Sequence, residues 1–337
     1  MKHHSLVTLS VLLLAAAPVA EPALQRFRYV EPHMGTRFEI ILYASDESTA
    51  RQASAAAFAR IASLDASMSD YRQESELMRL CAKAGGPPVR VSDDLFVVLR
   101  RAEEVSRRSG GAFDVTVGPV VRLWRRARRT QKLPERDQLA RALALVGYKN
   151  VRLDARGRTV QLLKPGMQLD LGGIAKGYAA DAALKALKKH GVTRALVAAG
   201  GDVAMSGPPP GAAGWRVAVA QLVGVEKSPP GKLVLHGAAV STSGDASQGV
   251  EIDGKRYSHI VDPRTGVGLV GRMGVTVVAP DGITADSLTK VVAVLGPAKG
   301  IPIIQETPGI SARVVRQTDK GAETVVSKGF PQLRPLE

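Results

Sequence analysis

An acid and a base stand four positions apart in the stretch TADSLTK, where Asp286 precedes Lys290. This spacing places both side chains on one face of a helix. Asp286 either holds a divalent cation, because hard cations prefer oxygen ligands, or pairs with the Lys290 ammonium, which then supplies the positive charge at the same place. A third interpretation is an exposed ion pair that contributes only about 0.3–0.5 kcal/mol.

The stretch LDLGGIAKGYAADAA, at 169–183, has the pattern of an anion site. A predicted strand leads into Gly172 and Gly173, and a predicted helix begins directly after them. Free N–H groups and the helix dipole converge at such an N-terminus, and Lys176 adds a positive charge in the first turn. Because the sequence lacks the G-x-G-x-x-G and Walker patterns, a tight turn with a solvated Lys176 explains the stretch equally well.

His259 lies before the turn 262–266 in YSHIVDPRTG. It is flanked by Ser258 and an apolar residue, and a lone His is more often structural. The chain has no Gly-x-Ser-x-Gly elbow, so a serine hydrolase triad is unsupported. The loops that contain Asp202 and Asp245 end predicted strands, as loops that line ligand clefts do, but each taken singly is better explained as a capped turn.

The elements that must position these residues indicate an α+β fold. Helices and strands are both frequent, and several strands follow one another directly. Strands are expected on both sides of 34–36, in a hairpin that turns at 155–157, and leading into Gly172. Helices are expected at 46–71, 92–110, 134–147, 175–191 and 284–296. Asp46 or Ser48 is expected to cap the first of these helices, and Ser92 the second.

Composition narrows the function classes. The 337 residues carry a formal net charge of +15, and much of the excess lies in VRLWRRARRTQK, at 121–132. No nucleic-acid-binding motif accompanies it, so we expect no nucleic acid partner. An anionic membrane surface or a phosphate-bearing ligand fits the charge, although a solvated helix face is the simpler interpretation of this run. The single Cys81 forms no internal disulfide, and no zinc pattern is present.

The first twenty residues predict export. Lys2, a short apolar run and the ending APVA match a signal peptide at 1–20, cleaved after Ala20. The alternative is a retained N-terminal anchor. We expect the mature protein to be periplasmic or otherwise extracytoplasmic, with a single domain at about 25–330.

Taken in order, these stretches resemble one family from about Arg26 to about Gly329. The motifs are MGT (34–36), SDYRQESELMRL (69–80), GAFDVTVGPVVRLW (111–124), LDLGGIAKGYAAD (169–181), GGD (200–202), TSGD (242–245), HIVDPRTG (259–266) and TADSLTK (284–290). Each is modest alone, but the set is similar to the ApbE family, the FAD:protein FMN transferases.

The resemblance implies an α+β fold of mixed, mainly antiparallel sheets with packed helices and an FAD cleft. It implies that FMN is transferred from FAD to a Thr or Ser hydroxyl of a target protein through a phosphoester bond, with release of AMP. It also implies a partner, an exported flavin-accepting subunit of a membrane electron-transfer complex. His259 matches the family's catalytic His. Matched cofactor-binding positions are Met34, Tyr71, Lys176, Asp181, Gly200, Gly201, Asp202, Ser243, Gly244 and His259.

The resemblance further implies a divalent metal, usually Mg²⁺, held by the carbonyl of Ala175, the carboxylate of Asp286 and a Thr hydroxyl. Here Lys290 stands at the Thr position, and a protonated lysine has no lone pair to offer a metal. Either Lys290 turns away, and water or Thr289 replaces the lost ligand, or its ammonium takes the place of the metal. The alternative function is therefore an exported FAD-binding protein or an FAD pyrophosphatase whose transferase activity is reduced or lost.

Overall fold

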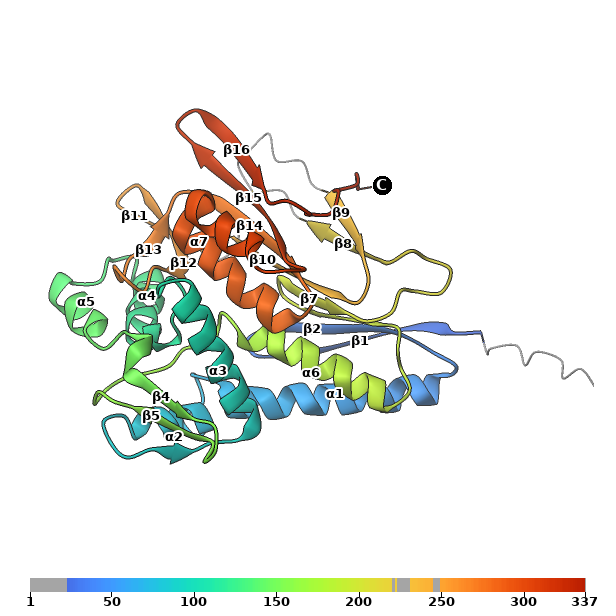
Figure 1. Cartoon of the computed structure of the whole chain (residues 1–337), viewed down its shortest axis with the longest axis horizontal. Coiled ribbons are helices and arrows are strands. Elements are labelled where there is room, and N and C mark those ends of the chain that lie inside the picture. The colour runs from blue at the N-terminus through green and yellow to red at the C-terminus, as the bar shows by residue number, and fades with distance from the viewer. Residues whose placement is uncertain (1–22, 220–221, 223–230, 245–248, 337) are drawn as a thin grey trace, which may run out of the picture.

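A computed structural model describes residues 23–219, 222, 231–244 and 249–336, so the predicted signal peptide lies outside the described residues. An eight-stranded sheet forms the centre, and helices cover one of its faces (Figure 1). Every strand pair in this sheet is antiparallel. The predicted α+β class with mainly antiparallel sheets is confirmed.

The strand order of the central sheet joins distant parts of the chain. Along the sheet the strands are β1 (Gln25–His33), β2 (Thr36–Ala44), β6 (Ala195–Ala199), β7 (Asp202–Met205), β10 (Ala238–Gly244), β14 (Met273–Ala279), β15 (Ser311–Thr318) and β16 (Gly321–Val326). The turn between β6 and β7 therefore lies next to the end of β10, although about forty residues separate this turn from the end of β10 in the sequence.

The helices α1 (Glu47–Met68), α6 (Ala175–Lys189) and α7 (Gly282–Gln305) pack on one face of this sheet. Strand alternation explains why: Phe38, Ile40 and Leu42 of β2 are fully buried in the core on that face. The intervening side chains of β2 face the opposite side, where β8 (Trp215–Val219) and β9 (Gly231–Leu235) form a separate two-stranded sheet.

Smaller elements flank the centre. They are α2 (Glu76–Ala82), α3 (Asp93–Arg108), α4 (Gly118–Thr130), α5 (Arg136–Leu143), the 3₁₀ turns η1 (Val115–Val117) and η2 (Tyr148–Asn150), the sheet of β3 (Val89–Arg90), β5 (Thr159–Leu162) and β4 (Val151–Asp154), and the sheet of β11 (Val250–Ile252), β12 (Lys255–Val261) and β13 (Gly268–Val270).

Two predicted helix caps are confirmed. The Asp46 carboxylate accepts a hydrogen bond from the backbone N–H of Thr49, and the Ser92 hydroxyl accepts one from the N–H of Leu95. The predicted strand into Gly172 is wrong, because residues 167–171 pair with no strand. Instead the Asp170 N–H donates to the carbonyl of Val115, 2.8 Å away, which ties this segment to η1.

The last helix, α7, is largely buried. Within the described part of the chain, α7 is long and apolar enough to cross a membrane by length and composition, but 56% of its most apolar window is buried inside the protein. It also bends at Gly296, which has a φ of 68° and precedes Pro297. These are properties of a core helix, and they place its N-terminal turns beside α6 and β10.

Candidate functional site

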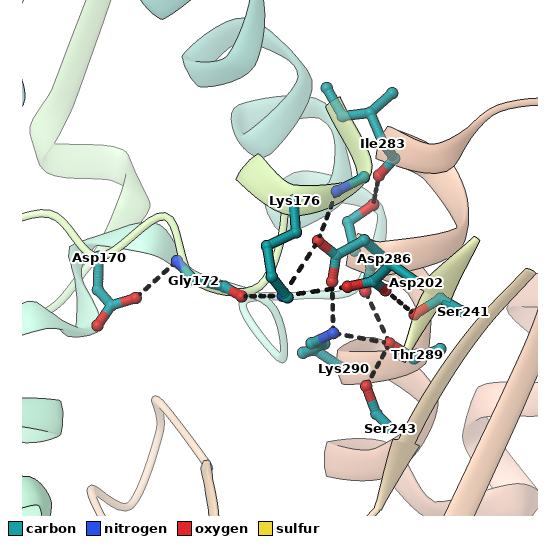
Figure 2. A network of polar contacts seen from close by, with 12 residues as sticks. Asp170, Gly172, Lys176, Asp202, Ser241, Ser243, Ile283, Asp286, Thr289 and Lys290 are labelled. Atoms are coloured by element: carbon teal, nitrogen blue, oxygen red, sulfur yellow. Dashed lines mark hydrogen bonds and ion pairs between the residues drawn. The ribbon is translucent and has the colours of Figure 1, made fainter. Parts of the chain in front are cut away.

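The N-terminal turns of α6 and α7 meet over the end of β10, and the polar side chains gather there (Figure 2). The backbone N–H of Gly177, in α6, donates to Oδ2 of Asp286, in α7, at 3.1 Å. Gly177 has no side chain to hold the helices apart, so Lys176 and Asp286 come within reach of each other. The structure thus brings together two residues that lie 110 positions apart in the sequence.

Asp286 is fully buried and is the centre of the cluster. Its Oδ1 lies 2.5 Å from Nζ of Lys290, and its Oδ2 lies 3.8 Å from Nζ of Lys176. Burial alone would raise the pKa of Asp286, but the two ammonium groups outweigh it and hold the pKa below its usual value. The third interpretation of the Asp286–Lys290 pair, an exposed surface ion pair, is therefore wrong.

Lys176 links Asp286 to a second buried carboxylate. Its Nζ lies 3.1 Å from Oδ2 of Asp202 and donates to the carbonyl of Gly172 at 3.1 Å. Burial would lower the pKa of Lys176, but the charges of Asp286 and Asp202 raise it well above its ordinary value. Lys176 is therefore a fixed cation at the start of α6, and the solvated lysine of the alternative interpretation is wrong.

Hydroxyl groups complete the cluster on the strand side. The Ser241 hydroxyl donates to Oδ1 of Asp202 at 2.5 Å. The Thr289 hydroxyl donates to the backbone carbonyl of Asp286 at 2.7 Å, and its oxygen lies 2.9 Å from Oγ of Ser243. Sequence reasoning missed Ser241. Because strand residues alternate between faces, its position two residues before Ser243 was the signal that could have found it.

The turn between β6 and β7 delivers Asp202 to this place. Gly200 has a φ of 66°, which favours glycine. A Cβ on Gly201 would lie 2.4 Å from the carbonyl oxygen of Thr242 in β10, so only glycine fits there. Gly244 ends β10 opposite Gly274 of β14. Asp245, of the predicted TSGD motif, lies outside the described residues.

His259 lies in β12, and the positive charges of Lys176 and Lys290 affect its pKa. The pKa of His259 is lowered to about 4, first by burial and then by the charges of Lys290, Arg128 and Lys176. Its Nδ1 is buried and has no hydrogen-bond partner among the described residues. The imidazole is therefore neutral at neutral pH, and a neutral imidazole is the form that accepts a proton.

Tyr71 belongs to a second network beside the first. The residue is 72% exposed, and the Arg125 guanidinium lies 4.4 Å from the centroid of its ring. Arg125 also bonds Asp70, and its Nη2 donates to Asp170 at 2.8 Å. The other oxygen of Asp170 accepts the N–H of Gly172 at 2.8 Å (Figure 2). Arg125, which sequence reasoning did not single out, thus connects Tyr71 to the loop that carries the Lys176 contact.

Met34 lies in the turn between β1 and β2. It has a φ of 48° and is partly buried against the core. Thr36, at the end of the same turn, lies close to Gly200, so a Cβ on Gly200 would be 3.2 Å from the Thr36 hydroxyl. The β1–β2 turn and the β6–β7 turn are therefore neighbours at the same edge of the sheet.

Asp181 lies apart from the cluster. Its carboxylate accepts the N–H groups of Gly282 at 2.7 Å and Ile283 at 3.0 Å, so it caps the start of α7. Burial raises the pKa of Asp181 to about 6, against the two hydrogen bonds that favour its charged form. It lines an open cavity of about 540 Å³ between α3, α6 and α7 that includes none of the lysine cluster. Its role in cofactor binding stays a prediction.

The oxygen atoms expected to hold a metal do not fit one as they stand. Ala175 is the first residue of α6, as expected, but an ammonium lies against Oδ1 of Asp286, and Lys290 offers no lone pair. No group of three or more His, Cys, Asp or Glu side chains that could hold a metal occurs among the described residues. The site instead presents two ammonium groups and the N-terminus of α6, which together suit a phosphate-bearing ligand.

The chain is similar to the proteins of one known family. Residues 34–314 match the model of the ApbE family. The chain is 33% identical over 287 residues to an FAD:protein FMN transferase of Klebsiella pneumoniae, which covers 85% of this chain and 88% of that protein. It is 36% identical over 259 residues to an FAD:protein FMN transferase of Treponema pallidum, with coverage of 73% and 72%.

Solved structures give the same result. The flavin transferase ApbE from Vibrio cholerae superposes with a TM-score of 0.81 at 28% sequence identity, over 91% of this chain and 99% of that chain. The apo form of the flavinyl transferase ApbE from Pseudomonas stutzeri superposes with a TM-score of 0.79 at 29% identity, over 90% and 95%.

Proposed function

This chain belongs to the ApbE family of flavin transferases, and from that premise we propose that it moves the FMN portion of FAD onto a Thr or Ser hydroxyl of a target protein. The observation that carries the proposal is the neutral His259 beside the fixed ammonium groups of Lys176 and Lys290. The imidazole of His259 is able to accept a proton, and the ammonium groups of Lys176 and Lys290 are able to bind a diphosphate.

In the proposed reaction the hydroxyl oxygen attacks the phosphorus on the flavin side of the FAD diphosphate. His259 takes the hydroxyl proton, a phosphoester bond forms, and the bond to the bridging oxygen breaks so that AMP leaves. Negative charge grows on the phosphoryl oxygens and on AMP. Lys176, Lys290 and the N–H groups at the start of α6 stabilise that charge. Because these groups are fixed before FAD binds, little reorganisation is needed.

The cofactor-binding residues divide over the site. Tyr71, exposed and backed by Arg125, offers a ring face for a flavin or adenine ring. Met34 and the turn 200–202 form the neighbouring edge, where glycines permit close approach of the ligand to the backbone. Ser243 and Gly244 end β10 on the same side.

Magnesium is the cofactor that the resemblance implies, and it stays a prediction. When bound, it would supply a Lewis acid at the diphosphate through Asp286 and the carbonyl of Ala175. The contact between Lys290 and Asp286 argues against that arrangement, so no step of the proposed reaction depends on it.

The partner and the location are further parts of the proposal. We propose an exported flavin-accepting subunit of a membrane electron-transfer complex as the target, met in the periplasm or another extracytoplasmic space. The basic run 121–132 falls mostly in α4, where Arg126 and Arg129 are exposed while Trp124 is buried. The exposed arginines support contact with an anionic membrane surface.

A second candidate function uses the same site with water as the nucleophile. Lys290 at the expected metal position favours this alternative, because a single ammonium replaces a divalent charge. The protein would then be an FAD pyrophosphatase, or an FAD-binding protein without turnover.

Incubation of the protein with FAD and a candidate flavin subunit tests these functions, in parallel reactions with Mg²⁺ and with EDTA. Transfer predicts a mass gain of one FMN on the subunit, in-gel flavin fluorescence and release of AMP. FMN and AMP without a mass gain would indicate the pyrophosphatase, and bound FAD without AMP would indicate the binding protein. His259→Ala should abolish the mass gain while FAD still binds.

A further inference from the structure

The Lys290 ammonium is held in a defined position inside the site. Its Nζ contacts Oδ1 of Asp286 at 2.5 Å and Oγ1 of Thr289 at 3.1 Å (Figure 2). Among the described residues these two contacts use two of its three N–H groups, which leaves the third for a ligand oxygen. Lys290 therefore resembles a cation bound by two protein oxygens.

The methylene stem of Lys290 packs against the loop before α6. A Cβ on Gly173 would lie 3.3 Å from Cγ and 3.5 Å from Cε of Lys290, so the loop before α6 packs directly on the methylene chain. The side chain is only 17% exposed. This packing and the low exposure disfavour the interpretation in which Lys290 turns aside.

Among the described residues, two carboxylates of the cluster face two ammonium groups. Asp202 and Asp286 carry two negative charges, and Lys176 and Lys290 carry two positive charges in contact with them. A divalent cation on Asp286 would meet both ammonium groups at short range and at low dielectric, where like charges repel strongly.

We propose that the Lys290 ammonium replaces the divalent cation at the FAD diphosphate, so that this chain binds FAD without a metal. The inference rests on the proposed function, because FAD is taken as the ligand. It assigns Lys290 as a substrate-binding residue whose N–H donor contacts a phosphate oxygen. Asp286 is the residue that holds Lys290 in place.

The test is isothermal titration of FAD into the full chain in EDTA and in excess Mg²⁺, with Lys290→Thr measured beside it. The wild-type dissociation constants should agree within about twofold in the two buffers. Lys290→Thr places a neutral oxygen at this position, and we expect it to bind FAD about tenfold or more tightly in Mg²⁺ than in EDTA, a difference of about 1.4 kcal/mol. Lys299→Thr, an exposed lysine in the same helix, is the matched control and should behave as wild type.

Electron paramagnetic resonance of Mn²⁺ gives a readout that requires neither turnover nor the variant. Wild-type protein with FAD should leave the free Mn²⁺ signal unchanged at stoichiometric concentration. Wild-type FAD affinity that falls tenfold in EDTA, or stoichiometric Mn²⁺ binding by the wild type, would overturn the proposal even if Lys290→Thr failed to fold. FAD binding that is independent of metal without FMN transfer would support it while removing the transferase function, and absence of FAD binding would overturn both.

Discussion

Gly177 of α6 lies directly against Gly282 of α7. A Cβ on Gly177 would be 2.1 Å from the carbonyl oxygen of Gly282, and a Cβ on Gly282 would be 2.5 Å from the carbonyl oxygen of Gly177. The two helices touch backbone to backbone at this point. Lys176 is adjacent to Gly177, and Asp286 lies one helical turn after Gly282. The contact therefore sets the distance between Lys176 and Asp286, and with it the geometry of the lysine cluster.

Replacement of Gly177 by Ala should push the helices apart. Because the obstruction is backbone on both sides, we expect a loss of about 1–3 kcal/mol in the free energy of unfolding and a weaker affinity for FAD, measured by urea unfolding and by flavin fluorescence. Gly274→Ala is the control, since its Cβ would make an ordinary contact at 3.5 Å with Leu222. Equal stability of the two variants would show that the helices can separate without cost.

Arg125 should matter through its geometry rather than through its charge alone. It contacts Asp70, Asp170 and the face of Tyr71 at once, which a lysine cannot do because it lacks the planar fork. Arg125→Lys should therefore destabilise the protein by about 1–2 kcal/mol and weaken FAD binding. Arg126→Lys, exposed in the same helix, should change both by little. If Arg125→Lys and Arg126→Lys had the same free energy of unfolding and the same affinity for FAD, the link from Tyr71 to the Gly172 loop would have no energetic role.

Because of His259, we expect both the stability of the protein and kcat/KM to fall at low pH. Its pKa is about 4 in the folded protein and about 6.5 when unfolded, so the unfolded chain binds more protons between these values. Stability should fall as the pH falls from 6.5 to 4, by up to about 3 kcal/mol, and the acid limb of kcat/KM should lie near 4.

The fall should be absent in His259→Gln, compared with wild type by urea unfolding at pH 7 and 4.5. His190→Gln, at the exposed end of α6, is the control and should follow the wild type. An acid limb near pH 6.5 in kcat/KM would mean that the imidazole is solvated rather than buried.

The contribution of Asp181 to stability should depend on pH in the opposite direction. Its folded pKa of about 6 lies above its unfolded value, so its contribution to stability is present below about pH 4 and is lost as the pH rises through 6. Asp181→Asn removes this titration. Relative to wild type, the variant should lose about 1–3 kcal/mol more at pH 4.5 than at pH 7.5.

Chemical unfolding at both pH values measures this difference, with the exposed Asp137→Asn as control. A constant difference between Asp181→Asn and wild type would mean that the two N–H groups from α7 keep Asp181 ionised throughout. FAD titration of the same variant tests the predicted cofactor role separately, because a residue that only caps α7 should leave the affinity nearly unchanged.

Local chemistry determined much of this structure from the sequence alone. Asp46 and Ser92 cap their helices because a side-chain oxygen three residues before a free N–H can bond it with no help from the rest of the chain. The strands around 34–36 and the hairpin at 155–157 follow from alternation and turn residues. The order of the motifs was sufficient to predict the family and the fold class. The strand expected before Gly172 does not form, because residues 167–171 pair with no strand and the Asp170 N–H bonds the carbonyl of Val115 instead.

The meaning of the Asp286–Lys290 spacing was decided only by the tertiary structure. The sequence of an i,i+4 Asp–Lys pair is the same whether the pair is exposed, the Asp holds a metal, or the Lys neutralises a buried carboxylate. Burial of Asp286 excludes the exposed pair, and the close crossing of Gly177 on Gly282 and the packing of Gly173 on the Lys290 stem support the proposal that Lys290 neutralises a buried carboxylate. The physical reason is that the energy of a charge depends on its solvation and on the other charges near it, and both are fixed by residues far away in the chain.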